Sequence, residues 1–236
     1  MSLTVVRLYH DLLGTYGDQG NAEILIHRAN ARGIQVELIE VTPGMPIPRS
    51  GNIYLLGGGE DGPQSASLEL MAKDGGLNEA ARLGATVFAV CAGFQVIGST
   101  LPGPDGLIID GLGLIDAHTI VNAAPRSVGE LIIQPIRSDL PVLTGFENHQ
   151  GLTNLGPGVT PLGKVLSGVG NGFDKHEGVW QGNIIGTYMH GPGLARNPEL
   201  ADAILESALG TKLSPYEDTF ANELAAERRR TLAKIT

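Results

Sequence analysis

The stretch Thr86-Val87-Phe88-Ala89-Val90-Cys91-Ala92-Gly93-Phe94-Gln95 decides the fold, because an uninterrupted apolar segment stops abruptly at small residues. Such a segment is typical of a buried parallel strand. Cys91 follows it directly and is the only cysteine of the chain. A sharp turn from a strand into a helix exposes one side chain and directs backbone N–H groups at whatever that side chain attacks. A helix start also favours the thiolate. A lone cysteine is otherwise commonly a small buried apolar residue, so the flanking residues are what favour a nucleophile.

Composition limits the classes to which the protein can belong. Its 236 residues are 42% apolar, which suffices for one large domain or for one domain and an appendage. The net charge of −9 argues against a nucleic-acid-binding protein, which needs a basic surface. One cysteine excludes an internal disulfide and predicts a cytoplasmic protein. No apolar run reaches membrane-spanning length and the first residues lack signal-peptide features, so we expect no membrane insertion.

Strands and helices alternate in the first part of the chain. This alternation predicts an α/β fold with a mainly parallel central sheet that helices cover on both faces. Ligands bind such sheets beyond the carboxyl ends of their strands, and both Gly57-Gly58-Gly59 and Cys91 lie at such ends. We expect strands at 3–9, 36–41, 53–56 and 86–90, and helices at 21–32 and 65–83, the second broken at 74–76.

After Pro102 the pattern changes to short strand-like segments separated by glycine, proline and asparagine turns, which predicts a mixed or antiparallel extension. We expect strands at 107–117, 128–136, 160–166 and 183–189, and helices at 197–209 and from Pro215 to about Ala233. We divide the chain into one large domain, residues 1–210, and a helical appendage, residues 211–236. The Arg228-Arg229-Arg230 run is typical of a solvated helix end, with a docking role as the alternative.

A thiol nucleophile needs a base, and His190 has the best sequence context among the six histidines. It follows the apolar segment 183–189 and precedes Gly191-Pro192-Gly193, so it also belongs at a strand end and can meet Cys91 at one rim. His27 belongs to a predicted helix. The others, His10, His118, His149 and His176, stay open at this point.

Acyl transfer also needs backbone donors for an oxyanion. The expected donors are the N–H of Ala92, just past the nucleophile, and the N–H of Gly58 or Gly59 at the exit of the neighbouring strand. Glycine lets the backbone approach a substrate closely. A phosphate-binding loop is disfavoured because no Gly-Lys-Ser/Thr follows the three glycines, and no residue pattern predicts a metal site.

Taken together, the Gly-Gly-Gly exit, Val90-Cys91-Ala92-Gly93-Phe94-Gln95 and Tyr188-Met189-His190-Gly191 resemble a class I glutamine amidotransferase domain over roughly residues 4–210. The fold that this implies has three layers around the central sheet. The chain is more similar to the branch with the amidases of cobyrinic and cobyric acid synthesis. Within that branch, residues 8–21, Arg126-Ser127-Val128-Gly129-Glu130 and Gly145-Phe146-Glu147-Asn148-His149-Gln150-Gly151 resemble the GatD family, the amidotransferase subunits of lipid II isoglutaminyl synthase.

The resemblance implies a glutaminase that forms a cysteinyl thioester. Cys91 attacks the side-chain amide of L-glutamine, and His190 gives a proton to the departing ammonia. Gln95 matches a family position that helps to hold the substrate. Arg126 is the candidate for binding the glutamine carboxylate, because a guanidinium can make a bidentate contact, with a structural ion pair as the alternative. No role is assigned to Asp18 or His149.

One position departs from the wider class, in which a glutamate commonly follows the histidine by two residues and orients it. Pro192 stands there instead. Either another residue of this chain or a partner subunit must supply the acid, and we expect the partner. The loss of an orienting acid lowers the rate by orders of magnitude, so the isolated chain is expected to be a weak glutaminase.

Ammonia is useful only where an activated carboxylate receives it, and activation needs ATP. The chain has no phosphate-binding loop and begins at the first predicted strand, so we expect a separate ATP-dependent partner that carries ATP and Mg²⁺, with no cofactor in this chain. The resemblance implies a heterodimer with a Mur-ligase-like synthetase subunit of the MurT type. That subunit activates the α-carboxylate of D-glutamate in lipid II, which becomes D-isoglutamine during peptidoglycan synthesis.

Three alternatives stay open at this point. The first is a glutaminase subunit of a cobyrinic or cobyric acid amidating enzyme, which differs only in the acceptor. The second is a non-catalytic binding subunit on the same fold, against which the intact Cys91 and His190 argue. The third is a stand-alone cysteine peptidase of the PfpI type, which would cleave peptides without a partner.

Overall fold

The computed structural model describes residues 2–232, in which three sheets and seven helices are assigned. The central sheet has six strands in the order β13-β14-β4-β3-β1-β2. Their bounds are β1 (Ser2–Leu8), β2 (Gln35–Val41), β3 (Ile53–Leu56), β4 (Thr86–Val90), β13 (Val179–Gln181) and β14 (Ile184–Thr187). All neighbours pair in parallel except β13, which runs antiparallel to β14. Every residue of β3, β4 and β14 is buried, which explains their unbroken apolar sequences.

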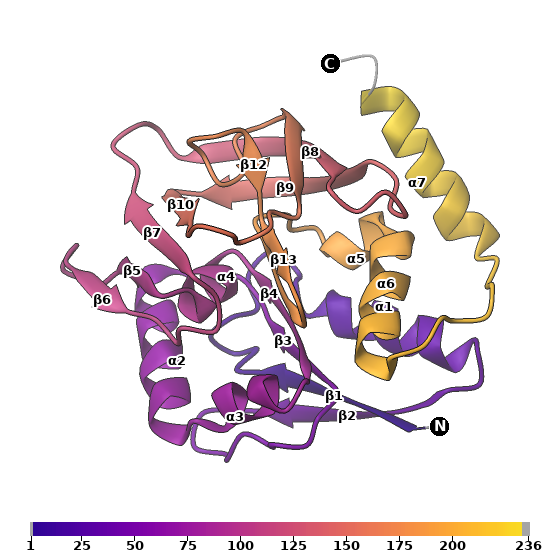
Figure 1. Ribbon diagram of the computed structural model, residues 1–236, viewed down its shortest axis with the longest axis horizontal. Coiled ribbons are helices and arrows are strands. Elements are labelled where there is room, and N and C mark those ends of the chain that lie inside the picture. Colours follow the sequence, from indigo (N-terminus) through magenta and orange to yellow (C-terminus); the bar gives the residue numbers. More distant parts are fainter. Residues whose placement is uncertain (1, 233–236) are drawn as a thin grey trace.

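Helices cover both faces of this sheet and make it the middle of three layers (Figure 1). The chain moves outward from β1 to β2 through α1 (Gly20–Asn30), and in the opposite direction from β3 to β4 through α2 (Asp61–Asp74) and α3 (Gly76–Arg82). Because such crossovers are right-handed, opposite directions place the helices on opposite faces. Contacts between elements agree with this, because α1 contacts α5 (Gly193–Arg196) and α6 (Pro198–Leu209), whereas α2 contacts α3 and α4 (Ala92–Ile97).

The order of strands reverses between β1 and β3, where ligands of such sheets characteristically bind. The segments that leave β1, β3 and β4 therefore meet at one edge of the sheet. The segment after β1 is the loop 9–19, the segment after β3 contains the three glycines 57–59, and Cys91 follows β4 directly. This reversal positions the site described below.

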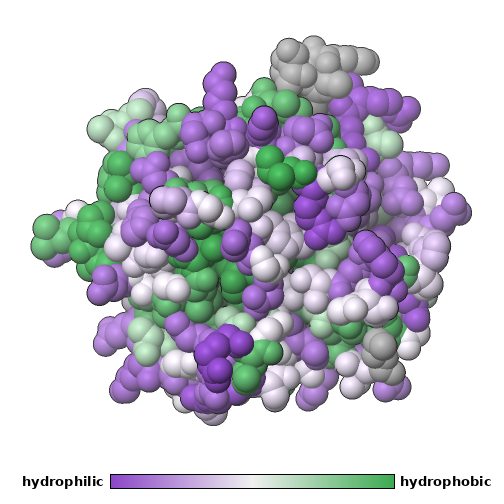
Figure 2. All heavy atoms as spheres, in the orientation of Figure 1, coloured by the Kyte–Doolittle hydropathy of each residue, from purple (hydrophilic) through white to green (hydrophobic). Residues whose placement is uncertain are grey.

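Two smaller sheets form the extension that follows α4. One has the order β10-β7-β5-β6 and the other the order β12-β11-β8-β9. Their bounds are β5 (Thr100–Pro102), β6 (Ile108–Asp110), β7 (Ala117–Val121), β8 (Ser127–Pro135), β9 (Leu143–His149), β10 (Gly151–Leu155), β11 (Gly163–Ser167) and β12 (His176–Glu177). Most pairs are antiparallel, so the predicted mixed extension is confirmed. Figure 2 shows apolar side chains at the outer edge where β6 lies, and Leu107 and Ile108 are more than half exposed there.

Several predicted boundaries need correction. The segment 107–117 is not one strand, because β6 ends at Asp110 and a loop precedes β7. The final helix α7 (Thr219–Leu232) begins four residues after Pro215, and its predicted end at Ala233 lies outside the described residues. Helix α7 packs against α5 and α6, and Arg229 of α7 forms an ion pair with Glu199 of α6. The break within 65–83 is confirmed at Gly75, whose φ of 72° is in the left-handed region that favours glycine.

None of the described helices is both long and apolar enough to cross a membrane. The division of the chain at residue 210 stays a prediction.

Candidate active site

Cys91 stands on a strained turn between β4 and α4. Its φ of 51° and ψ of −107° lie outside the regions that non-glycine residues normally adopt. Strain of this kind persists only where the surroundings enforce it. Here the Cys91 N–H donates to the Thr187 carbonyl (2.8 Å) and the Gly93 N–H donates to the Gly57 carbonyl (3.1 Å). The turn is therefore tied to both neighbouring strands, and Cys91 is 7% exposed at the carboxyl edge of the sheet.

His190 follows β14 and is fully buried. Two backbone hydrogen bonds with Phe146 hold it, one in each direction (2.8 and 3.1 Å). Its Nδ1 atom lies 2.8 Å from Asp18 Oδ2, and this contact directs the opposite nitrogen, Nε2, away from the carboxylate. Nε2 has no hydrogen-bond partner within the described residues.

The orienting acid is therefore Asp18 of this chain. The expectation that a partner subunit supplies it is wrong. Asp18 is 4% exposed and lies in the loop after β1, in one of the stretches that carried the family resemblance. The reason for expecting a weak isolated glutaminase disappears with this correction.

The surroundings of His190 favour its protonated form. Burial by itself lowers the pKa of His190, but the interactions with Asp18 and with the Cys91 sulfur outweigh burial and raise it to about 10. The ring of His190 therefore lies beside the Cys91 sulfur as well as Asp18, and Tyr16 packs edge-on against it with ring centroids 4.9 Å apart. An imidazole between a thiol and a buried carboxylate is the arrangement that transfers a proton to and from a cysteine nucleophile.

The three glycines differ in what their N–H groups do. The Gly58 N–H donates to Asp18 Oδ2 (2.9 Å), so Gly58 is not available as an oxyanion donor, contrary to one of the two predicted options. A Cβ at Gly58 would lie 2.6 Å from His190 Cε1, which explains why glycine is needed there. Among the described residues, the N–H groups of Gly59 and Ala92 have no acceptor, and both residues line the pocket at Cys91.

A pocket of about 200 Å³ opens at Cys91. It brings together five of the seven predicted site residues, since Gly59, Cys91, Ala92, Gln95 and Arg126 line it. His190 lies behind Cys91 and does not line the pocket, and Gly58 faces His190.

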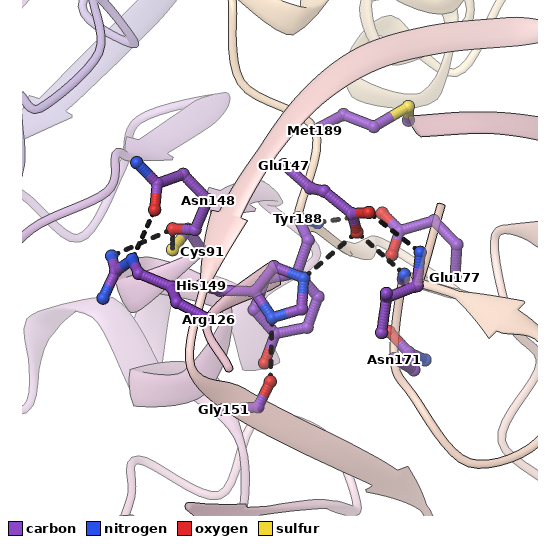
Figure 3. A network of polar contacts seen from close by, with 12 residues as sticks. Cys91, Arg126, Glu147, Asn148, His149, Gly151, Asn171, Glu177, Tyr188 and Met189 are labelled. Carbon is purple, nitrogen blue, oxygen red and sulfur yellow. Dashed lines mark hydrogen bonds and ion pairs between the residues drawn. The ribbon is translucent and has the colours of Figure 1, made fainter. Parts of the chain in front are cut away.

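Arg126 lines the pocket and is held there by hydrogen bonds to Asn148. Its guanidinium donates to the side-chain oxygen of Asn148 and to the Asn148 carbonyl (3.1 Å from Nη2). The same carbonyl lies 3.9 Å from Cys91 Sγ, so the arginine, the asparagine and the nucleophile gather on one side of the site (Figure 3). Arg126 itself is exposed, and among the described residues its guanidinium contacts Asn148 and no carboxylate, which argues against the structural ion pair.

Gln95 is fixed by two other side chains. Its Oε1 accepts from Gln64 Nε2 (2.8 Å), and its Nε2 donates to the hydroxyl of Tyr188 (3.1 Å). The Gln64 amide also donates to the Ala92 carbonyl (3.2 Å). The amide of Gln95 therefore has one orientation in the pocket wall.

Behind the pocket lies a buried polar network that the sequence analysis left without a role (Figure 3). Its ionisable members are Glu147, His149 and Glu177, each at most 3% exposed. His149 also lines the pocket and stacks on the ring of Tyr188, with centroids 3.9 Å apart. Glu147, His149 and Tyr188 belong to stretches that carried the family resemblance, whereas no sequence signal singled out Glu177.

Comparison with known proteins agrees with this geometry. The family model of the CobB/CobQ-like glutamine amidotransferase domain matches residues 4–198. The chain is 36% identical to the "Lipid II isoglutaminyl synthase (glutamine-hydrolyzing) subunit GatD" of Staphylococcus aureus (strain N315), over 91% of this chain and 88% of that protein. It is also 36% identical to the GatD subunit of Streptococcus pneumoniae (strain ATCC BAA-255 / R6), over 95% of this chain and 90% of that protein. A cobyric acid synthase of Mesorhizobium japonicum is 31% identical, over 66% of this chain but only 32% of that protein.

Solved structures support the fold. A crystal structure of a glutamine amidotransferase superposes with a TM-score of 0.60 at 21% identity, covering 86% of this chain and 98% of that one. The structure of PurLQS from Thermotoga maritima gives 0.54 at 16% identity, covering 89% and 99%. The predicted three-layer fold is thereby confirmed. On the family match and on two relatives that share more than a third of their residues with it, the chain belongs to the CobB/CobQ-like glutamine amidotransferases.

Proposed function

We propose that this chain hydrolyses L-glutamine at Cys91 and passes the ammonia to a separate ATP-dependent synthetase that amidates lipid II. The observation that carries the proposal is the alignment of Cys91, His190 and Asp18 at the edge of the pocket. The acceptor is inferred from the similarity to two GatD subunits over nine-tenths of the chain.

In the first half of the reaction, His190 already carries the proton of the Cys91 thiol, and the resulting thiolate attacks the side-chain amide carbon of glutamine. The N–H groups of Ala92 and Gly59, which have no acceptor within residues 2–232, hold the oxyanion. When the carbon–nitrogen bond breaks, the nitrogen takes the proton from His190 and leaves as ammonia. A γ-glutamyl thioester remains on Cys91.

In the second half, His190 removes a proton from water, which attacks the thioester carbonyl. Glutamate leaves, and His190 keeps the proton beside the Cys91 thiolate. Asp18 accepts the Nδ1–H of His190 throughout, so it fixes the tautomer and stabilises the imidazolium. Arg126, which is exposed and lines the pocket, binds the glutamine carboxylate through two parallel hydrogen bonds, and Gln95 supports the substrate from the pocket wall.

The partner that fits the relatives is a Mur-ligase-like subunit of the MurT type, which binds ATP and Mg²⁺ and activates the α-carboxylate of D-glutamate in the stem peptide. Attack by ammonia then gives D-isoglutamine. Cobyric acid synthases are also relatives, and a corrinoid acceptor is the alternative. This chain spans only a third of those proteins, whereas it spans nine-tenths of the GatD subunits, and that difference favours lipid II.

The test combines the purified chain with a MurT-type subunit, glutamine, ATP, Mg²⁺ and either lipid II or a cobyrinic acid acceptor. We expect amidated lipid II, and the loss of product with Cys91→Ala unless free ammonia is added. Amidation of the corrinoid alone would overturn the acceptor, and product formation from glutamine by Cys91→Ala would overturn the glutaminase assignment.

A further inference from the structure

The side chain of His149 is enclosed by two hydrogen-bond acceptors. Nδ1 lies 2.8 Å from the Gly151 carbonyl oxygen, which can only accept, and Nε2 lies 3.2 Å from Glu147 Oε2. The Glu147 carboxylate already accepts from the backbone N–H groups of Val169 (2.8 Å) and Gly170 (2.9 Å), which favours its ionised form. With Glu147 ionised, both ring nitrogens of His149 donate, and the ring is then an imidazolium paired with Glu147.

This ion pair is almost entirely removed from water, since His149 is 2% and Glu147 3% exposed. A buried ion pair contributes little to stability beyond what apolar residues of the same size would contribute, because desolvation offsets the attraction. Stability alone therefore does not explain why two charges are placed here. Their position in strand β9, directly beside the nucleophile and its base, points to a role in the site.

Strand β9 contacts both catalytic residues through its backbone. Phe146 makes the two hydrogen bonds that hold His190, and the Asn148 carbonyl lies 3.9 Å from Cys91 Sγ. Glu147 and His149 alternate with these two residues and anchor the same strand from within the network (Figure 3). A shift of β9 would displace the contacts to His190 and Cys91 together.

The ring of His149 also supports the pocket wall. It stacks on Tyr188 at a centroid distance of 3.9 Å and an interplanar angle of 20°. The Tyr188 hydroxyl accepts from Gln95 Nε2 (3.1 Å) and shares a hydrogen bond with Thr153 (2.7 Å). The orientation of the Gln95 amide thus depends on where His149 holds the tyrosine ring.

We propose that His149, held as an imidazolium by Glu147, is a positioning residue of the glutaminase site. It fixes the Asn148 carbonyl against Cys91 through β9, and the Gln95 amide through the Tyr188 ring. The inference rests on the proposed glutaminase function. Its test must therefore separate the arrangement of the site from the reactivity of the thiol and from the stability of the fold.

The experiment compares Glu147→Gln, His149→Phe and the double variant Glu147→Gln/His149→Phe, each with the partner subunit present. His149→Phe keeps an aromatic ring and removes the charge, and the double variant removes both charges, so we expect the singles to unfold at lower urea concentration and the double variant to recover. Asp202→Asn is the matched control, because it weakens the Arg28–Asp202 ion pair between α1 and α6. We expect it to lower stability without a change in glutaminase rate.

Two labels distinguish positioning from accessibility at Cys91. Iodoacetamide reports the reactivity of the thiol alone, whereas a glutamine-analogue diazoketone requires a correctly held substrate. For the double variant we expect diazoketone labelling and kcat to fall at least tenfold, iodoacetamide labelling to stay within about twofold, and KM to change little. If stability and diazoketone labelling recover together, the ion pair is only structural and the inference is overturned.

Tyr188→Phe tests the same contacts without touching a charge, should the other variants fail to fold. It keeps the ring on which His149 stacks and removes the hydroxyl that holds Gln95. We expect diazoketone labelling to fall at least threefold with unchanged iodoacetamide labelling, and an unchanged diazoketone rate would overturn the link through Tyr188. Should the wild-type protein itself resist the diazoketone in the presence of its partner, the proposed function fails, and this inference with it.

Discussion

Replacement of Asp18 by asparagine is the most informative single change in the site. The amide that Asp18→Asn introduces keeps the size of the carboxylate, and its oxygen can still accept from the Gly58 N–H, but it carries no charge to stabilise the His190 imidazolium. The pKa of His190 rises from 6.5 to about 10 although burial lowers it, so Asp18 and Cys91 together contribute at least about 5 kcal/mol. Half of this, about 2.4 kcal/mol, is roughly a 60-fold change in rate. With the loss of tautomer control, we expect kcat to fall on the order of 10²–10³.

The assay is glutamate release at saturating and limiting glutamine, in the presence of the partner subunit. Because Asp18 does not line the pocket at Cys91, KM should stay within about threefold of the wild-type value. Without the carboxylate the pKa of His190 falls, so the imidazolium that protonates ammonia is lost at lower pH. The alkaline limb of the kcat/KM profile, which reports groups of the free enzyme, should therefore move down by at least about one unit from its wild-type position near the His190 pKa of about 10. Asp11→Asn is the control, because Asp11 is exposed in the same loop. A variant that keeps kcat within threefold and the same alkaline limb would refute the reasoning.

Three further predictions concern stability, the base and the substrate. Burial raises the pKa of Glu177 from 4.5 to about 7, so between these values the folded state binds more protons than the unfolded state and stability falls as pH rises. Urea denaturation should show that Glu177→Gln lacks this loss of about 3 kcal/mol. If the free energy of unfolding of the variant and of the wild-type protein falls in parallel with pH, the prediction is contradicted. Gly58→Ala should displace His190, since the new Cβ would lie 2.6 Å from its ring, and lower kcat at least tenfold while the protein stays folded by circular dichroism. Arg126→Lys should raise KM for glutamine about tenfold with little change in kcat, because a lysine cannot make the bidentate contact, and an unchanged KM would exclude a carboxylate-binding role.

Local sequence was sufficient to predict the strands of the parallel core. Strands 53–56 and 86–90 are found at the predicted residues, because fully buried parallel strands leave unbroken apolar runs. The short antiparallel strands were harder to delimit. In 107–117, apolar residues continue through a loop between β6 and β7, because Leu112 and Ile115 of that loop belong to the core and Leu114 packs against it. Composition alone does not separate a strand from such a loop.

The site was predictable where chemistry and strand ends coincide, as at Cys91 and His190. Asp18 was not assigned, because it lies 172 residues from His190 in the chain and only the reversal between β1 and β3 brings its loop to the base. The distinction between Gly58 and Gly59 was equally out of reach, since it depends on which N–H the Asp18 carboxylate takes. Contacts across distant loops, not residue types, decide both assignments.

The central claim is that glutamine turnover passes through a covalent intermediate on Cys91. His190 transfers the protons for its formation and hydrolysis, and Asp18 orients His190. The most direct measurement is intact-mass analysis and peptide mapping of the protein after acid quenching during glutamine turnover. We predict a γ-glutamyl adduct on the peptide that contains Cys91, and no adduct and no glutamate release with Cys91→Ala. Continued glutamate release by Cys91→Ala, or an adduct mapped to another residue, would contradict the account.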